Sequence, residues 1–150
     1  MRIALGCDHG GIDLKDATIR AIVDNSHEYI DYGTYSHESV DYPDYAMKVA
    51  LAIRNGEADK GILICGTGIG ISIAANKFRG IRCAHVVDVF SAQMCVEHND
   101  ANIMAMGGRI TDSTDAYKLV EKYLQSTFAG GRHAIRVDKI KAIEDKEFNR

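Results

Sequence analysis

The hydrophobic positions along this chain switch repeatedly between two patterns. Short runs rich in branched apolar residues predict five strands, at 2–7, 29–32, 60–65, 82–87 and 102–106. Longer segments of helical period predict helices at 12–23, 44–54, 72–77, 90–97, 115–128 and from about residue 134 into the charged tail. The run 60–65 is almost wholly apolar, which is typical of a central strand covered on both faces.

Regular alternation of strands and helices with short connections predicts an α/β fold. The expected arrangement is a parallel sheet of about five strands with helices on both sides and right-handed crossovers. The pattern leaves the strand order open. The length of 150 residues, without a repeat or linker, predicts one domain that spans 1–150.

Composition excludes several classes of protein. Hydrophobic residues make up 46% and charged residues 26%, as in an ordinary globular protein, and the net charge of −3 argues against general attraction to nucleic-acid phosphates. No apolar run approaches the roughly 20 residues that span a bilayer, so no membrane partner is expected. The N-terminal stretch Met1 to Asp8 meets a charge too early to serve as a secretory signal, which favours the cytoplasm. There the four cysteines should be free thiols, with Cys83 and Cys95 in the core.

Reactive side chains and glycines follow three of the predicted strands. Ligands bind at the carboxyl ends of the strands in open α/β sheets, so these turns are candidate site segments. They are Asp8-His9-Gly10-Gly11, the loop Cys65-Gly66-Thr67-Gly68-Ile69-Gly70, and Gly107-Gly108-Arg109. Asp8 and His9 form a candidate acid–base pair, although the same residues also suit a turn that caps the first helix.

The glycine loop joins a buried strand to the start of a helix, where free backbone N–H groups favour an anion. Its spacing fits no nucleotide motif: Ile71 replaces the third glycine of a dinucleotide fingerprint, and the Gly-Lys-Ser/Thr of a P-loop is absent. Cys65 opens this loop, and a thiolate there is a competent base or nucleophile. The alternative is an inert cysteine at the end of a buried strand.

The segment His98-Asn99-Asp100 falls at the other end of the sheet, about 15 Å or one strand length from Cys65. It is either a simple helix stop or part of the site of a second subunit across a two-fold interface. Arg132 and Arg136, one helical turn apart, are expected to join Arg109 near ligand-facing turns, where guanidinium groups suit phosphate.

The remaining histidines suggest no metal site. His27 and His37 resemble solvated loop residues, and His85 is interpreted as a structural residue within a strand. No pair of histidines has zinc-ligand spacing, so no metal is expected.

Five segments, in order and spacing, carry a resemblance to a known family over essentially the whole chain. They are Asp8-His9-Gly10-Gly11, Asp41-Tyr42-Pro43, Cys65 to Gly70, His98-Asn99-Asp100-Ala101-Asn102 and Gly131-Arg132-His133-x-x-Arg136. The sequence resembles ribose-5-phosphate isomerase type B, in the wider group that includes galactose-6-phosphate isomerase subunits. The resemblance implies a Rossmann-like three-layer α/β/α sandwich. It also implies a homodimer or tetramer, no metal or organic cofactor, and a place in the pentose phosphate pathway.

The resemblance also implies roles for residues of this chain. Cys65 matches the base that moves a proton through a cis-enediolate, and His98, from a partner subunit, matches the acid–base that helps open the sugar ring. Asp8 is expected to assist catalysis and to line the sugar, and Thr67 to assist through the backbone anion hole. The expected substrate contacts are Asp8, His9, Tyr42, Gly66, Thr67, Gly68, Ile69, Gly70, Asn99, Arg109, Arg132 and Arg136.

Two alternatives stay open from the sequence. One is an isomerase for six-carbon sugar phosphates; a lone chain that carries every motif favours the five-carbon enzyme, because the galactose enzyme needs two different subunits. The other is a binding module that senses a phosphorylated metabolite without turnover.

Overall fold

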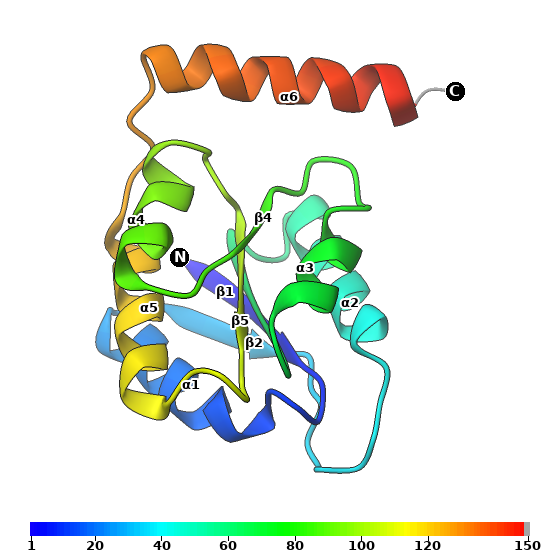
Figure 1. The fold of residues 1–150 in the computed structure, drawn as a ribbon, viewed down its shortest axis with the longest axis vertical. Coiled ribbons are helices and arrows are strands. Elements are labelled where there is room, and N and C mark those ends of the chain that lie inside the picture. Colours follow the sequence, from blue (N-terminus) through cyan, green and yellow to red (C-terminus); the bar gives the residue numbers. More distant parts are fainter. Residues whose placement is uncertain (149–150) are drawn as a thin grey trace.

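The computed structural model describes residues 1–148, which form one parallel sheet with helices on both faces (Figure 1). The sheet order is β2-β1-β3-β5-β4, and every neighbouring pair is parallel. The strands are β1 (Arg2–Cys7), β2 (Glu28–Asp31), β3 (Lys60–Cys65), β4 (Cys83–His85) and β5 (Ile103–Gly107). The predicted fold class is confirmed, and the structure supplies the strand order that the sequence left open.

The helices form the two outer layers. They are η1 (Ile12–Leu14), α1 (Lys15–Asp24), α2 (Tyr42–Arg54), α3 (Ile69–Ala75), α4 (Val89–Glu97), α5 (Ser113–Gln125) and α6 (Arg132–Phe148). Figure 1 shows α1, α4 and α5 on one face of the sheet and α2 and α3 on the other. Alternate residues of β3 enter the two cores, because successive side chains of a strand point to opposite faces: Ile62 and Ile64 join one core, and Leu63 and Cys65 the other.

Two predicted segments are shorter in the structure for local reasons. The strand predicted at 82–87 ends at His85, because the N–H groups of Val87 and Asp88 bond to the Ser91 hydroxyl in the cap of α4. The helix predicted at 115–128 ends at Gln125. Ser126 is extended (φ −82°, ψ 146°), and the chain then runs to α4, where the N–H of Ala129 donates to the carbonyl of Glu97.

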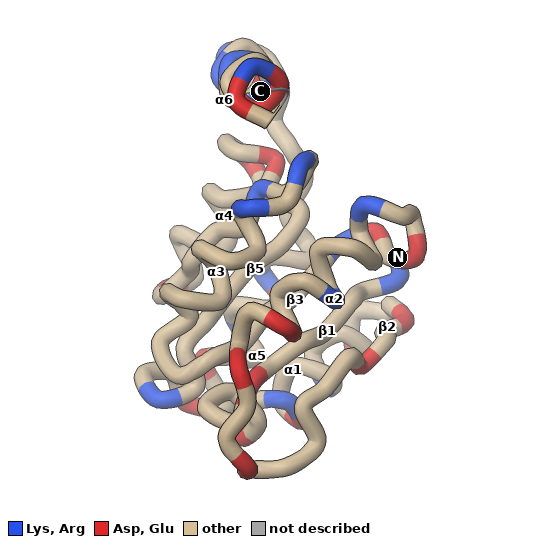
Figure 2. The backbone as a smooth tube through the Cα atoms, turned by 90° about the vertical axis from the view of Figure 1, so that its right-hand side faces the viewer, with Lys and Arg blue, Asp and Glu red and all other residues tan. Residues whose placement is uncertain are grey.

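The last helix, α6, stands apart from the two layers, beyond the end of the sheet where β5 begins (Figures 1 and 2). Its far end contacts the loop after α3, since the Gly80 N–H donates to Glu144 Oε1 over 2.9 Å and Arg79 pairs with Asp145. Across 1–148, none of the helices has the length and apolar character needed to span a membrane.

The strand order places a crevice at the carboxyl ends of β1 and β3. The chain passes from β1 to β2 on one side and then returns to β3 on the other, and such a switch point is where open α/β sheets bind ligands. Cys7 pairs in register with Ile64, and Cys65 with Gly107. The three turns singled out in the sequence therefore meet at one edge of the sheet.

Candidate active site

A pocket of about 210 Å³ opens at this edge. Residues from the three turns and from the start of α2 line it: Asp8, His9, Tyr42, Cys65, Gly66, Thr67, Gly70 and Arg109. Eight of the residues predicted for the site thus lie together within one chain. The predicted residues Gly68 and Ile69 belong to the same loop. The Gly68 N–H donates to the Cys65 sulfur, and Ile69 is half exposed.

Cys65, the last residue of β3, is 4% exposed, and its sulfur accepts a hydrogen bond from the Gly68 N–H over 3.2 Å. The turn that creates this contact needs glycine at 68, which has φ +79° and whose Cβ would lie 2.8 Å from the backbone of Met106. Neighbouring backbone secures the loop, because the Gly108 N–H donates to the Cys65 carbonyl over 2.7 Å. The sulfur is therefore held in a fixed position.

Asp8 and His9 are held by backbone groups on the other side of the pocket. The buried Asp8 carboxylate accepts the N–H of Gly10 over 2.8 Å. His9 Nδ1 accepts the N–H of Val40 over 3.2 Å, so the neutral ring carries its proton on Nε2. This arrangement leaves an Nε2–H donor for a ligand.

Arg109 and Tyr42 pack directly on glycines of the loop. A Cβ on Gly66 would lie 2.9 Å from Arg109 Nη1, and one on Gly70 would lie 2.7 Å from Tyr42 Cζ. Any larger residue at either glycine would displace these side chains. The pocket therefore combines a thiol, a carboxylate, an imidazole, a phenol and a guanidinium around exposed loop backbone.

Four predicted site residues, His98, Asn99, Arg132 and Arg136, lie elsewhere in the chain. His98 caps the end of α4, before β5 begins, and its ring stacks on that of His133 in α6 with 4.1 Å between centroids and 10° between planes. Arg132 opens α6 and Arg136 follows one turn later, both exposed. The expectation that Arg132 and Arg136 join Arg109 is wrong within one chain, because α6 lies beyond the amino ends of the strands.

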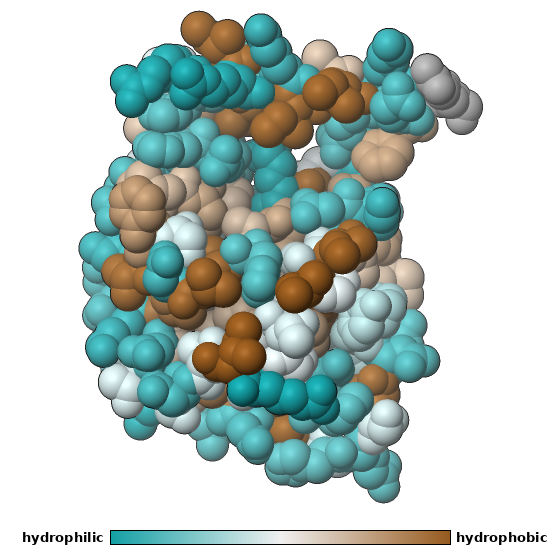
Figure 3. All heavy atoms as spheres, in the orientation of Figure 1, coloured by the Kyte–Doolittle hydropathy of each residue, from teal (hydrophilic) through white to brown (hydrophobic). Residues whose placement is uncertain are grey.

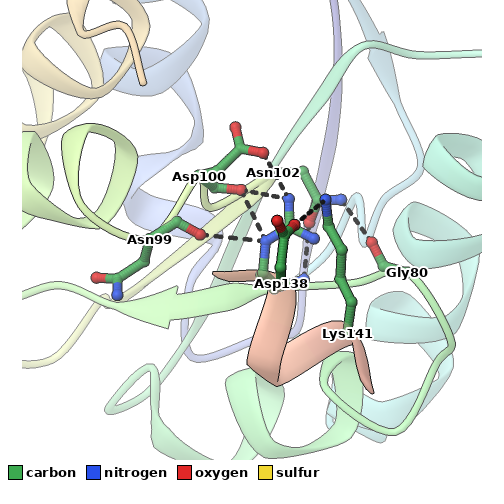
Figure 4. Close-up of polar contacts among 7 residues, drawn as sticks. Gly80, Asn99, Asp100, Asn102, Asp138 and Lys141 are labelled. Carbon is green, nitrogen blue, oxygen red and sulfur yellow. Dashed lines mark hydrogen bonds and ion pairs between the residues drawn. The ribbon is translucent and has the colours of Figure 1, made fainter. Parts of the chain in front are cut away.

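The turn at 98–100 is fixed by Arg82, the residue before β4. Arg82 donates to the carbonyls of Asn99 and Asp100 over 3.1 and 2.7 Å, and its charge pairs with the Asp100 carboxylate over 2.9 Å. Figure 4 shows Asn99, Asp100 and Asn102 gathered here beside Gly80, with Asp138 and Lys141 of α6 close by. Asp100 is held at φ +49°, which few residues other than glycine adopt. The hydrogen bonds of Arg82 therefore hold the turn at 98–100 in one defined conformation.

His85 is the residue whose role the sequence did not indicate. It ends β4 rather than lying within a strand, and its Nε2 is 2.8 Å from the Thr67 carbonyl oxygen of the glycine loop. Only its place at the carboxyl end of a strand could have drawn attention to it.

Cys83 and Cys95 match the expectation of buried core residues, and Cys7 is buried as well. Burial raises the pKa of the Cys7 and Cys95 thiols to about 11 and raises that of Cys83 further, with the charge of Cys95 adding to the last shift. Within the described part of the chain, no cluster of three or more His, Cys, Asp or Glu side chains could hold a metal ion.

The fold and the pocket define an α/β enzyme whose pocket holds an arginine and side chains capable of acid–base chemistry. Residues 3–140 match the Ribose/Galactose Isomerase family. The chain belongs to this family and is an isomerase.

Individual relatives extend over nearly the whole chain. The chain is 50% identical to ribose-5-phosphate isomerase B of Escherichia coli, over 97% of each protein. The structure of ribose-5-phosphate isomerase B from Clostridium thermocellum superimposes with a TM-score of 0.95 at 51% identity, over 98% of this chain and 99% of the other. The enzyme from Mycoplasma genitalium, solved with bound ribulose 5-phosphate, gives a TM-score of 0.90 at 36% identity, over 96% of each chain.

Proposed function

We propose that this protein interconverts ribose 5-phosphate and ribulose 5-phosphate through a cis-enediolate, in a single isomerase domain spanning 1–150. The observation that carries this proposal is the fixed, buried Cys65 sulfur in a pocket that also presents Asp8, His9 and Arg109. Ribulose 5-phosphate bound to a relative of 36% identity supports the choice of a five-carbon substrate.

In the proposed reaction, Cys65 as the thiolate takes the proton from C2 of the open-chain aldose and returns it to C1, while the hydroxyl proton of O2 passes to O1. Negative charge develops on the substrate oxygens, and N–H donors of the Thr67–Gly70 loop other than that of Gly68, which faces the Cys65 sulfur, stabilise it in place. A positioned base of this kind contributes about 10²- to 10⁴-fold to the rate. Asp8 and His9 bind the sugar hydroxyls, and Arg109 supplies positive charge to the phosphate.

We further propose that the protein acts as a homodimer whose active sites are shared. His98, Asn99, Arg132 and Arg136 are exposed or half-buried at the opposite end of the sheet, where they reach a Cys65 pocket only if it belongs to a second chain. A largely apolar groove of about 460 Å³ lies between α6 and the body, with Ile140 and Ile143 on one side and Ile81 and Cys83 on the other. Figure 3 shows hydrophobic side chains on α6 and on the body beneath it.

The decisive experiment follows both turnover and proton exchange. Wild-type protein should convert ribose 5-phosphate and exchange its C2 proton with solvent, and Cys65→Ala should lose both by about 10²-fold or more. Cys95→Ala, which alters a buried thiol of α4 outside the pocket, is the matched control. Faster turnover of a six-carbon aldose phosphate would replace the proposed substrate. Binding of ribulose 5-phosphate without any proton exchange would instead identify a sensor.

A further inference from the structure

We infer that His85 is a positioning residue for the Cys65 base, acting through the peptide unit between Thr67 and Gly68. This inference rests on the proposed role of Cys65. Both hydrogen bonds of that peptide are accounted for: its carbonyl oxygen lies 2.8 Å from His85 Nε2, and its N–H donates to the Cys65 sulfur over 3.2 Å. His85 and Cys65 are thus joined through one planar group.

The strand order makes this link possible. β5 lies between β3 and β4, so the loop from Cys65 crosses the end of β5 and reaches His85 on the edge strand. A Cβ on Gly68 would lie 2.8 Å from both the His85 ring and the Met106 backbone. The Thr67–Gly68 peptide is therefore confined between the imidazole and the end of β5.

Because the peptide bond is planar, the contact with His85 also sets the orientation of the N–H that faces the Cys65 sulfur. The carbonyl and the N–H of a peptide lie in one plane and point in opposite directions. Rotation of that plane therefore breaks both hydrogen bonds at once. A donor on the carbonyl also polarises the amide and strengthens the bond that its N–H makes. His85 therefore fixes the direction of the N–H that faces Cys65 and strengthens its interaction with negative charge on the sulfur. Both the neutral Nε2–H form and the charged ring supply the required donor.

Three substitutions at 85 separate this role from general packing. His85→Leu removes the donor, His85→Gln places an amide N–H near the position of Nε2, and His85→Asn is too short to reach the Thr67 carbonyl. His27→Leu, at the amino ends of the strands beside Met1, is the matched control. Each variant is assayed for kcat and KM with ribose 5-phosphate, and for the rate at which iodoacetamide labels Cys65 at pH 7, followed by peptide mass spectrometry. Burial raises the pKa of each of the other three thiols, which favours selective labelling.

We expect kcat and the labelling rate to fall about fivefold in the Leu and Asn variants, the ratio that corresponds to one net hydrogen bond. KM should change little, and the Gln variant should recover most of both rates. Unchanged labelling in the Leu and Asn variants, unchanged kcat, or a Gln variant no better than Asn would overturn the inference. If the Leu variant does not fold, the comparison of kcat and labelling rate between the Gln and Asn variants decides the inference by itself. The labelling rate needs no turnover, so it reports on His85 even if Cys65→Ala shows that Cys65 is not the base.

Discussion

The rings of His98 and His133 stack face to face, 4.1 Å apart between centroids, and join the turn after α4 to the first turn of α6. Through this contact, the two motifs that we propose to bind substrate in a second chain form one surface at the amino ends of the strands. The stack presents His98 together with Arg132 and Arg136 as a unit. A shared active site would receive all three at once.

Hybrid dimers test the shared site. Cys65→Ala and His98→Ala should each be inactive, yet a mixture that exchanges subunits should recover about a quarter of wild-type activity, because half the dimers are hybrids with one intact site of two. The control mixes Cys65→Ala with the double variant Cys65→Ala/His98→Ala, which cannot build an intact site. No recovery after subunit exchange verified by mass spectrometry would mean that His98 does not complete a partner's site.

Arg82 should affect the partner's site rather than its own. Arg82→Gln frees the turn at 98–100, and a displaced catalytic group loses about tenfold or more in rate. Hybrid dimers purified through two different affinity tags separate an effect of Arg82 on the partner's site from an effect on the site of its own chain. A Cys65→Ala chain with an Arg82→Gln chain keeps one site with an intact turn. A Cys65→Ala/Arg82→Gln chain with a wild-type chain pairs the remaining Cys65 with the loosened turn.

We expect wild-type activity per intact site in the first hybrid and about a tenfold loss in the second. Thermal melting of both hybrids controls for general destabilisation. Equal activities would show that Arg82 has no directed effect across the interface.

Stability should decrease as the pH falls below neutrality. Burial lowers the pKa of His133 below its ordinary 6.5, and the positive charges of His98, Arg132 and Arg136 add to the shift. The unfolded chain then binds the proton more tightly than the folded chain. The contribution of His133 to the free energy of unfolding is therefore fully present above pH 6.5 and is lost as the pH falls towards the lowered pKa. The check is the free energy of unfolding in urea from pH 7.5 to 5.5.

His133→Gln should flatten this dependence on pH. Replacing His27 as well should flatten it further, because burial and the N-terminal amine lower the pKa of His27 in the same direction. A slope equal to that of wild type in the His133→Gln variant would disprove the assignment.

A buried ion pair should stabilise the loop that leads to the site. Lys15 Nζ lies 3.0 and 3.1 Å from the two carboxylate oxygens of Asp31 and also donates to the carbonyl of Thr34. With the Lys15 side chain only 10% exposed, Asp31→Ala leaves a nearly buried charge without its partner and should cost about 3 kcal/mol. Lys118→Ala, which breaks an exposed pair with Asp115, should cost less than about 1 kcal/mol. Urea unfolding measures both, and equal costs would contradict the expectation.

Much of the pocket could be predicted from the sequence because its parts are local. Asp8 and Arg109 follow recognisable strands and Cys65 ends one, and the carboxyl ends of parallel strands share one edge. The glycine loop has its own backbone signature. Such patterns depend only on residues that are near one another in the sequence. They therefore predict both the strands and helices and the reactive side chains at the ends of the strands.

The tertiary structure alone decided what depends on long-range neighbours. The position of β5 between β3 and β4 brings His85 to the Thr67 carbonyl, and no local pattern encodes that order. The direction of α6 after Gly131 separates Arg132 and Arg136 from Arg109, although all three suit phosphate chemically. Periodicity fixes which face of a segment is buried but not which distant segment buries it. The elements and the motifs that line the pocket were therefore accessible from the sequence, whereas the long-range contacts that position them were not.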